Sequence, residues 1–231
     1  MQFDEKTGDV YLDVFKEAPV RALKPGETLI YAGDDATQVF NIVSGCLMVS
    51  RLGKDGRRQV MSFLFKDNFV GLTATDSYFF TVQAITPSSI AWRSREHLEG
   101  YLARDPSAER TFREMVFRVL ENSLDLVYSL GQRTAVERLA VFILYLRQQY
   151  RIANGTESGP DTVDLPMSRQ DIADFLGLKK ETVSRSFTAL DEKGLIKRPD
   201  AHSVDILDVE ALRELAGITD FSSPFRLAAP R

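Results

Sequence analysis

The fold is decided by residues 167–193, MSRQDIADFLGLKKETVSRSFTALDEK. Ser168 is followed three residues later by Asp171, which is the pattern of a capping box, so a helix is expected to begin there. The apolar residues of this helix share one face: Ile172, Ala173 and Leu176. Gly177 then supplies a tight turn before a second helix. The stretch therefore predicts two helices joined by a short turn.

The second helix is expected to have one buried and one exposed face. Its apolar residues recur at i, i+4 and i+7: Val183, Phe187 and Leu190. Its polar residues recur on the opposite face: Glu181, Ser184, Arg185 and Thr188. A polar face that begins near the N-terminus of the second helix is typical of helices that enter the major groove of DNA. The alternative is a helical hairpin whose polar face is only solvated.

The residue types on this polar face suit the reading of base edges. Arg185 can donate to O6 and N7 of a guanine, Glu181 can accept from N4 of a cytosine, and Ser184 can contact either kind of edge. Lys180 could reach an outer base or only the backbone, and we group it with the base contacts. Residues 178–199 contain six basic and three acidic residues, so this segment carries +3 in a chain of net charge −4. Such a local excess is expected of a DNA-binding surface.

The segment resembles the helix-turn-helix of the Crp/Fnr family of bacterial transcription factors. The pattern Glu181-x-x-Ser184-Arg185 matches the Fnr and FixK branch, whereas the cyclic-AMP receptor branch has Gly at the position of Ser184. The lead-in at 165–173, LPMSRQDIA, is similar to FixK-type proteins. The resemblance implies a dimer that binds an inverted repeat of TTGA-like half-sites, with Arg185 on the guanine.

One residue departs from the family pattern. Lys179 stands where the family usually has Ser or Thr as N-cap of the recognition helix. Lys is a poor cap, and its charge opposes the helix dipole, although near a DNA phosphate the same charge is favourable. We expect five residues to contact DNA phosphates: Ser168, Arg169, Gln170, Lys179 and Thr188.

Length and composition bound the class of protein. A chain of 231 residues can form one large or two modest domains, and its 44% hydrophobic and 27% charged residues are ordinary for a globular protein. No run approaches 18 apolar residues, and the N-terminus lacks the form of a signal peptide. Cys46 is the only cysteine, so an internal disulfide is excluded. These features predict a cytoplasmic protein with no membrane span.

Short apolar or alternating runs, separated by turn residues, fill residues 19–95 and predict a closed antiparallel roll or sandwich. The runs are 28–31, 39–43, 47–51, 59–65, 79–85 and 89–93. Residues 11–15 are expected to form a small helix before them. The glycine spacing of the region resembles the cupin-like β-roll sensor domain of the Crp/Fnr family.

The roll carries few residues for a metal or a cluster. A cupin-shaped enzyme usually holds a metal with two or three His and a carboxylate, but the only histidines are His97 and His202, outside the strand region. The iron–sulfur cluster of Fnr needs four cysteines. Cys46 is expected to be a buried small residue, with a redox role as the alternative. Haem ligation by His97 is a further alternative.

Cyclic-nucleotide binding is not expected. Members of the family that bind one use a Gly-Glu pair for the ribose and an Arg-Ser pair for the phosphate. Here Gly71 is followed by Leu72, and Tyr78 and Phe79 stand where Arg-Ser is required. A buried cyclic phosphate would then lack a counter-charge. An aromatic cluster either fills the core, which we favour, or lines an apolar pocket: Phe63, Phe65, Phe69, Tyr78, Phe79 and Phe80.

A long helix is expected from about Ser107, after a short one over 96–106. An a/d seam predicts a dimer interface along it: Phe112, Val116, Val119, Ser123, Leu126 and Leu130. Four more apolar residues widen the stripe toward the helix's own roll: Met115, Leu120, Leu124 and Val127. The alternative is a helix buried only within its own chain. Residues 131–133 are expected to break the helix and act as a hinge.

The remaining segments complete a winged helix-turn-helix. Thr134 with Glu137 forms a second capping box and starts a helix that ends near Tyr150. Residues 153–161 read as a polar loop. Strands at 194–196 and 204–207 form the wing, a helix follows at 208–216, and the tail from Gly217 is expected to be loose.

The sequence thus predicts an α+β chain with three parts: a cupin-like antiparallel β-roll (1–106), a dimerisation helix (107–131) and a winged helix-turn-helix (132–231). By resemblance it is a homodimeric, FixK-like transcription factor that needs no cofactor, metal or catalytic residue. Its expected partners are double-stranded DNA, a second copy of the chain and RNA polymerase. The alternative is a regulator gated by haem, a nitrogen oxide or a small apolar effector in the roll; a metabolic enzyme ranks third.

Overall fold

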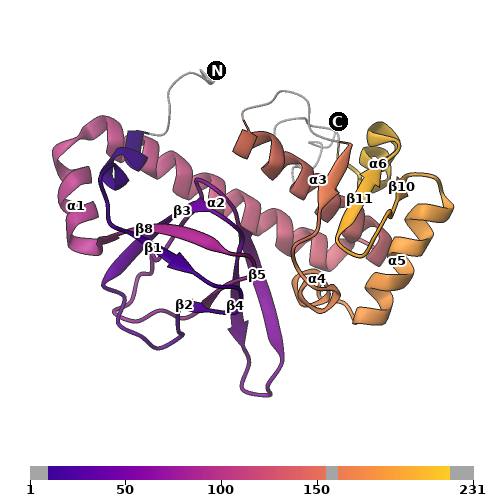
Figure 1. The fold of residues 1–231 in the computed structure, drawn as a ribbon, viewed down its shortest axis with the longest axis horizontal. Helices are drawn as coiled ribbons and strands as arrows, with labels where there is room; N and C mark the ends of the chain where they lie inside the picture. The colour runs from indigo at the N-terminus through magenta and orange to yellow at the C-terminus, as the bar shows by residue number, and fades with distance from the viewer. Residues whose placement is uncertain (1–9, 155–160, 219–231) are drawn as a thin grey trace. The chain divides into compact units, whose positions relative to one another are not determined.

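The computed structural model describes residues 10–154 and 161–218 (Figure 1). The chain divides into two compact units, the first formed by Met1–Leu52 and Met61–Leu120, the second by Gly53–Val60 and Glu121–Arg231. Two elements cross this division, strand β5 (Arg58–Leu64) and helix α2 (Pro106–Gln132).

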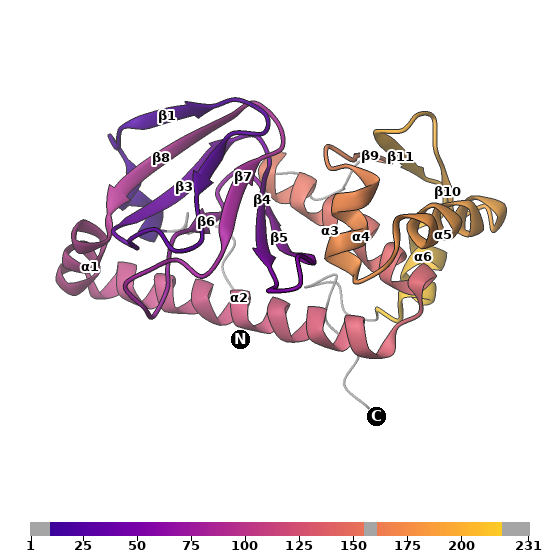
Figure 2. The same ribbon diagram turned by 90° about the horizontal axis from the view of Figure 1, so that it is seen from below.

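The first unit is an antiparallel roll of two four-stranded sheets, with orders β1-β8-β3-β6 and β2-β7-β4-β5 (Figure 2). The expected antiparallel roll is therefore confirmed. Besides β5, its elements are η1 (Val10–Phe15), β1 (Val20–Leu23), β2 (Thr28–Ile30), β3 (Gln38–Ser44), β4 (Leu47–Leu52), β6 (Phe69–Val70), β7 (Thr81–Ala84), β8 (Ser88–Ser94) and α1 (Arg95–Arg104).

Strand β3 has apolar groups on both of its faces. Phe40 and Ile42 belong to the core between the two sheets, together with Ile90 of the neighbouring strand β8. Val39 points to the opposite face, where it packs with Leu98 of helix α1. Because side chains alternate along a strand, both faces can be buried only where both are covered, which explains the nearly continuous apolar run of β3.

Two strands of the roll were not predicted, β1 and β6. Strand β6 has only two residues, and the exposed residues of β1 give no alternation that marks a buried face. The run expected at 79–85 is a strand only over Thr81–Ala84, and Phe79 before it is 47% exposed. Phe63, Tyr78 and Phe80 are buried, as the core interpretation of the aromatic cluster predicts.

Helix α1 ends at Arg104 with Asp105 as its C-cap, and helix α2 follows at once with Pro106 as its first residue. Proline is well tolerated at this position because the N–H that it lacks would have no helical partner. The break expected at 131–133 is present at its C-terminal end: α2 continues through Gly131 and Gln132, and Arg133 and Thr134 separate it from the next helix. One exposed glycine near a helix end costs only about 1 kcal/mol relative to Ala, which is too little to end the helix.

The second unit is helical with a small sheet. Its helix α3 (Ala135–Asn154) starts at the predicted capping box, in which Glu137 Oε2 accepts from the Thr134 N–H at 2.8 Å. The helix extends beyond the expected end at Tyr150. Its consecutive residues Leu139–Leu144 are all buried, because β9, α4, α5 and α6 contact α3. The other elements are β9 (Thr162–Asp164), α4 (Arg169–Leu176), α5 (Lys180–Glu192), β10 (Ile196–Lys197), β11 (Ser203–Ile206) and α6 (Val209–Ala216).

The wing is a three-stranded sheet of order β10-β11-β9. Strands β10 and β11 were expected, whereas β9 was not, because its three residues adjoin the polar segment predicted as a loop. Asp208 caps α6 by accepting from the N–H of Ala211 at 2.9 Å. Most of the predicted loop 153–161 and most of the predicted loose tail lie outside the described residues.

Substitutions of two phenylalanines in the roll, one buried and one half exposed, test the burial described above. Phe63 has no exposed surface, so Phe63→Ala should lower the free energy of unfolding by roughly 3–5 kcal/mol. Phe79→Ala is the matched control; this ring is half exposed and packs on Phe80, and its loss should cost about 1 kcal/mol. Urea unfolding followed by the fluorescence of Trp92, the only tryptophan, reports on this unit. Equal losses for the two variants would contradict the assigned burial.

Candidate nucleic-acid interface

The first helix of the motif, α4, starts at a complete capping box. The Ser168 hydroxyl accepts from the Asp171 N–H at 3.1 Å, and the Asp171 carboxylate accepts from the Ser168 N–H at 3.0 Å. The predicted start is therefore confirmed. The apolar face that was expected is buried: Ile172, Ala173, Phe175 and Leu176.

The turn after α4 and the start of α5 also follow the sequence. Gly177 is left-handed, with φ 63° and ψ 38°, and its N–H donates to the Ala173 carbonyl. Lys179 is the N-cap of α5 and makes no side-chain cap hydrogen bond. The first turn of α5 thus begins with two lysines, Lys179 and Lys180, at the end of the helix where the dipole disfavours positive charge.

Helix α5 separates its side chains as predicted. Three apolar residues have no exposed surface: Val183, Phe187 and Leu190. The residues predicted to read bases are all exposed: Lys180, Glu181, Ser184 and Arg185. The Ser184 hydroxyl donates to the Lys180 carbonyl at 3.2 Å and the Thr188 hydroxyl to the Ser184 carbonyl at 3.3 Å. These bonds are local to the helix, so the structure leaves this polar face open to a partner.

The residues predicted to contact phosphates lie at the N-termini of α4 and α5 and on the exposed face of α5. Ser168, Gln170, Lys179 and Thr188 are exposed, and Arg169 is half-buried. Arg169 lies on the ring of Phe187, with its guanidinium carbon 3.9 Å from the ring centroid. Helix N-termini with nearby cations are suited to bind anions.

A network of carboxylates and one arginine holds the first turn of α4. The Gln170 amide donates to Asp174 at 2.7 Å. Arg58, which belongs to the same compact unit, donates to Asp171 at 2.5 Å and to Asp174 at 2.7 Å. Arg58 therefore neutralises two acidic groups beside the predicted phosphate contacts. Sequence reasoning missed this residue, because ion pairs more than a hundred positions apart leave no local pattern.

A second unpredicted arginine comes from the wing. Arg198 follows strand β10, and its guanidinium carbon lies 5.6 Å from the centroid of the same Phe187 ring that Arg169 covers. The sequence shows Arg198 only as one of six basic residues in a positively charged segment. Three segments thus meet at Phe187: the start of α4, the middle of α5 and the end of β10.

Helix α2 carries an exposed apolar surface. Seven large apolar residues of this helix are between 41% and 67% exposed: Val116, Phe117, Val119, Leu120, Leu124, Val127 and Tyr128. Of the other predicted seam residues, Ser123 is exposed, whereas Phe112, Leu126 and Leu130 are half-buried. Phe112 packs edge-on against Phe69, with ring centroids 5.8 Å apart, so it serves the core of the roll.

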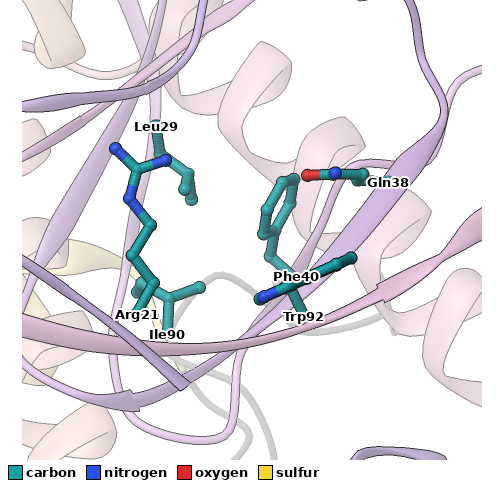
Figure 3. Close-up of a pocket in the computed structure, with 6 residues that line it drawn as sticks. All are labelled: Arg21, Leu29, Gln38, Phe40, Ile90 and Trp92. Atoms are coloured by element: carbon teal, nitrogen blue, oxygen red, sulfur yellow. The ribbon is translucent and has the colours of Figure 1, made fainter. Parts of the chain in front are cut away.

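A small cavity of about 250 Å³ lies in the roll (Figure 3). Arg21, whose side chain pairs with Glu27 at 2.9 Å, stands at its margin. None of the six aromatic residues considered as a pocket lining takes part: the cavity is lined by Arg21, Leu29, Gln38, Phe40, Ile90 and Trp92. Its volume falls below the roughly 300–1,000 Å³ of typical ligand pockets.

The side chains that could support redox or metal chemistry are Cys46 and His97. Cys46 is buried, and burial raises the pKa of its thiol to about 12, so the reactive thiolate is suppressed at neutral pH. The expectation of a small buried residue is confirmed. His97 is exposed. Within residues 10–154 and 161–218 no group of three or more metal-ligating side chains gathers. No helix in these ranges is long and apolar enough to cross a membrane.

Comparison with known proteins gives the same picture. Residues 137–215 match the Crp-like helix-turn-helix domain and residues 20–105 the cyclic nucleotide-binding domain. The nitrogen fixation regulation protein FixK of Rhizobium meliloti is 34% identical over 196 residues, which cover 85% of this chain and 86% of that protein. FixK of Bradyrhizobium diazoefficiens is 36% identical over 171 residues, covering 74% and 71%. The structure of FixK2 from Bradyrhizobium japonicum has a TM-score of 0.80 at 28% identity, covering 88% and 99%.

A winged helix-turn-helix joined to an antiparallel roll by a long helix defines a DNA-binding transcriptional regulator. The chain belongs to the Crp/Fnr family of these regulators, and its relatives include FixK proteins. The resemblance to the Crp/Fnr family is therefore confirmed. The proteins matched are regulators of transcription and not enzymes.

The uncapped start of α5 yields a prediction for stability. Lys179→Ser should supply the missing side-chain cap and raise the free energy of unfolding by about 0.5–2 kcal/mol. Lys179→Ala is the matched control, since it removes the same charge without adding a cap, and it should gain less. Denaturant unfolding followed by circular dichroism in the absence of DNA measures both. Equal stability of the Ser and Ala variants would show that the cap at this position contributes nothing.

Proposed function

We propose that the chain binds, as a homodimer, an inverted repeat of TTGA-like half-sites, and that helix α5 reads the bases in the major groove. The main support for this proposal is the exposed polar face of α5. The opposite face of the same helix is anchored by three fully buried apolar residues. A helix fixed in this way can present its N-terminal half to base edges without rearrangement.

Each base contact has a chemical reason. Arg185 donates two hydrogen bonds to the guanine of the half-site, and Glu181 accepts from the cytosine paired with it or from a neighbouring amino group. Ser184 lies near a thymine, and Lys180 reaches an outer base. The phosphate contacts fix the register: Ser168, Arg169, Gln170, Lys179 and Thr188.

The regulatory roll is proposed to leave DNA binding independent of cyclic nucleotides and of any cofactor. Tyr78, which stands where a phosphate-binding Arg is required, is buried and donates its hydroxyl to the Gln38 carbonyl at 2.6 Å. Leu72 stands where the ribose-binding carboxylate is required. We further propose that the chain has three functional segments: the roll (1–106), the dimerisation helix (107–131) and the winged helix-turn-helix (132–231). The proposal includes a cytoplasmic location and no catalytic activity.

The second copy of the chain is proposed to cover the apolar surface of α2. A row of exposed Val, Leu and Phe side chains along one helix is an apolar patch that a monomer would leave in water. Two-fold pairing along α2 would bury it and would place two recognition helices about 34 Å apart on one face of DNA. RNA polymerase is the further partner that we propose, because the relatives include a transcriptional activator, FnrL.

The dimer is tested by charged substitutions in the exposed surface of α2. Val119→Glu combined with Val127→Glu should give monomers that bind DNA poorly, because two buried carboxylates would face their symmetry mates. Val20→Glu is the matched control, since Val20 is 61% exposed on strand β1 and lies outside the proposed interface. Sedimentation velocity measures the assembly state. A double variant that stays dimeric would refute the interface.

Base reading is tested by Arg185→Ala. Loss of a bidentate arginine contact costs roughly 1–3 kcal/mol of discrimination, so specific binding should weaken by about tenfold or more and the preference for guanine should relax. Lys179→Ala is the control, because loss of a phosphate contact should weaken binding to all sequences alike. Titrations on the consensus duplex and its single-base variants measure both effects. An unchanged guanine preference in Arg185→Ala would mean that α5 is misplaced in the groove.

A further inference from the structure

Two arginines from separate elements share one aromatic ring in the second unit. Phe187 has no exposed surface, and the guanidinium carbons of Arg169 and Arg198 lie 3.9 and 5.6 Å from its centroid. Arg169 is the first residue of α4, and Arg198 directly follows β10 of the wing. The ring therefore holds two cations beside the recognition helix through attraction to its π-system.

The two arginines on the Phe187 ring carry positive charge that no carboxylate among the described residues balances. In the described part of the chain neither Arg169 nor Arg198 forms an ion pair with a carboxylate, and the buried Nε of Arg198 has no hydrogen-bond partner there. Burial lowers the pKa of the Arg169 guanidinium, and the neighbouring Arg198 lowers this pKa further. The Arg169 guanidinium nevertheless stays charged at neutral pH. Two partly desolvated like charges without a counter-ion oppose folding, and an anion between or beside them would relieve that cost.

We propose that Arg169 and Arg198 form a phosphate clamp on Phe187, which binds the phosphodiester backbone of DNA beside the recognition helix. The proposal rests on the proposed function and adds Arg198 of the wing to the phosphate contacts. A guanidinium presents a planar fork of donors that matches phosphate oxygens. Because the ring already holds both forks, less side-chain freedom is lost on binding. The DNA backbone is favoured over a small free anion because the clamp adjoins the exposed face of α5.

The clamp predicts opposite effects on stability and on DNA binding. Arg198→Ala removes one of two repelling cations, so the melting temperature of the protein without DNA should stay unchanged or rise. Its affinity for DNA should fall on all sequences alike, and the slope of log K against log salt should shrink by about one unit. Lys193→Ala, which removes an exposed charge at the C-terminal end of α5, is the matched control and should leave the slope unchanged.

Two further variants exclude a merely structural role. Arg198→Lys keeps the charge without the fork and should restore most of the salt slope; if it does not, the charge of Arg198 is not what DNA contacts and the clamp is refuted. The double variant Arg169→Ala with Arg198→Ala should lose less affinity than the two single losses combined, because the arginines share one site. Additive losses would refute a shared clamp.

The remaining outcomes separate the proposals. If the unaltered protein shows no sequence preference, the proposed function fails whatever Arg198 does. If it binds specifically and Arg198→Ala keeps the full salt slope, only the clamp fails. Melting in inorganic phosphate against chloride of equal ionic strength tests the other source of anion. Stabilisation by phosphate that Arg198→Ala abolishes, with no change in the DNA salt slope, would assign the site to a free anion and overturn the DNA assignment.

Discussion

The recognition surface depends on the burial of one side of helix α5. Val183, Phe187 and Leu190 have no exposed surface, and helices α3 and α4 pack against α5. Because a helix distributes its side chains at 3.6 residues per turn, fixing these three residues determines which others point outward. The polar face of α5 is thus set by apolar packing in its own unit, and α3, whose residues Leu139–Leu144 are all buried, provides the support.

Several features of this unit lower the stability of the folded protein in the absence of DNA. Lys179 leaves the start of α5 without a side-chain cap, and Arg169 and Arg198 bring two cations to one ring. Local rules of stability are commonly broken at functional sites, where a ligand supplies the missing interaction. Both features leave excess positive charge or unused hydrogen-bond donors, so a single polyanion could pair with all of these groups. The ion pairs of Arg58 serve the same end, because they remove the negative charge of two nearby carboxylates.

Features with a local physical cause could be predicted from the sequence. The capping boxes at Ser168 and Thr134, the turn at Gly177 and the two faces of α5 each follow from residues within one or two helical turns. Features that depend on distant partners could not. Strand β9 is defined by its pairing with β11, and the stacking of Arg198 on Phe187 joins the wing to the recognition helix. The helix break expected at 131–133 lies at the end of that range, because Gly131 weakens a helix without ending it. The lining of the small cavity in the roll could not be predicted either, because its residues come from β1, β2, β3 and β8, which are far apart in the sequence.

The central claim is that two copies of α5 read one symmetric site. Selection of bound duplexes from a random DNA pool by the unaltered protein tests it most directly, because no sequence is assumed in advance. The account predicts enrichment of an inverted repeat whose TTGA-like half-sites are centred about one helical turn, roughly 10 base pairs, apart. Enrichment of a single half-site or of a direct repeat would contradict the symmetric dimer, and a pool without any enriched sequence would contradict base reading by α5.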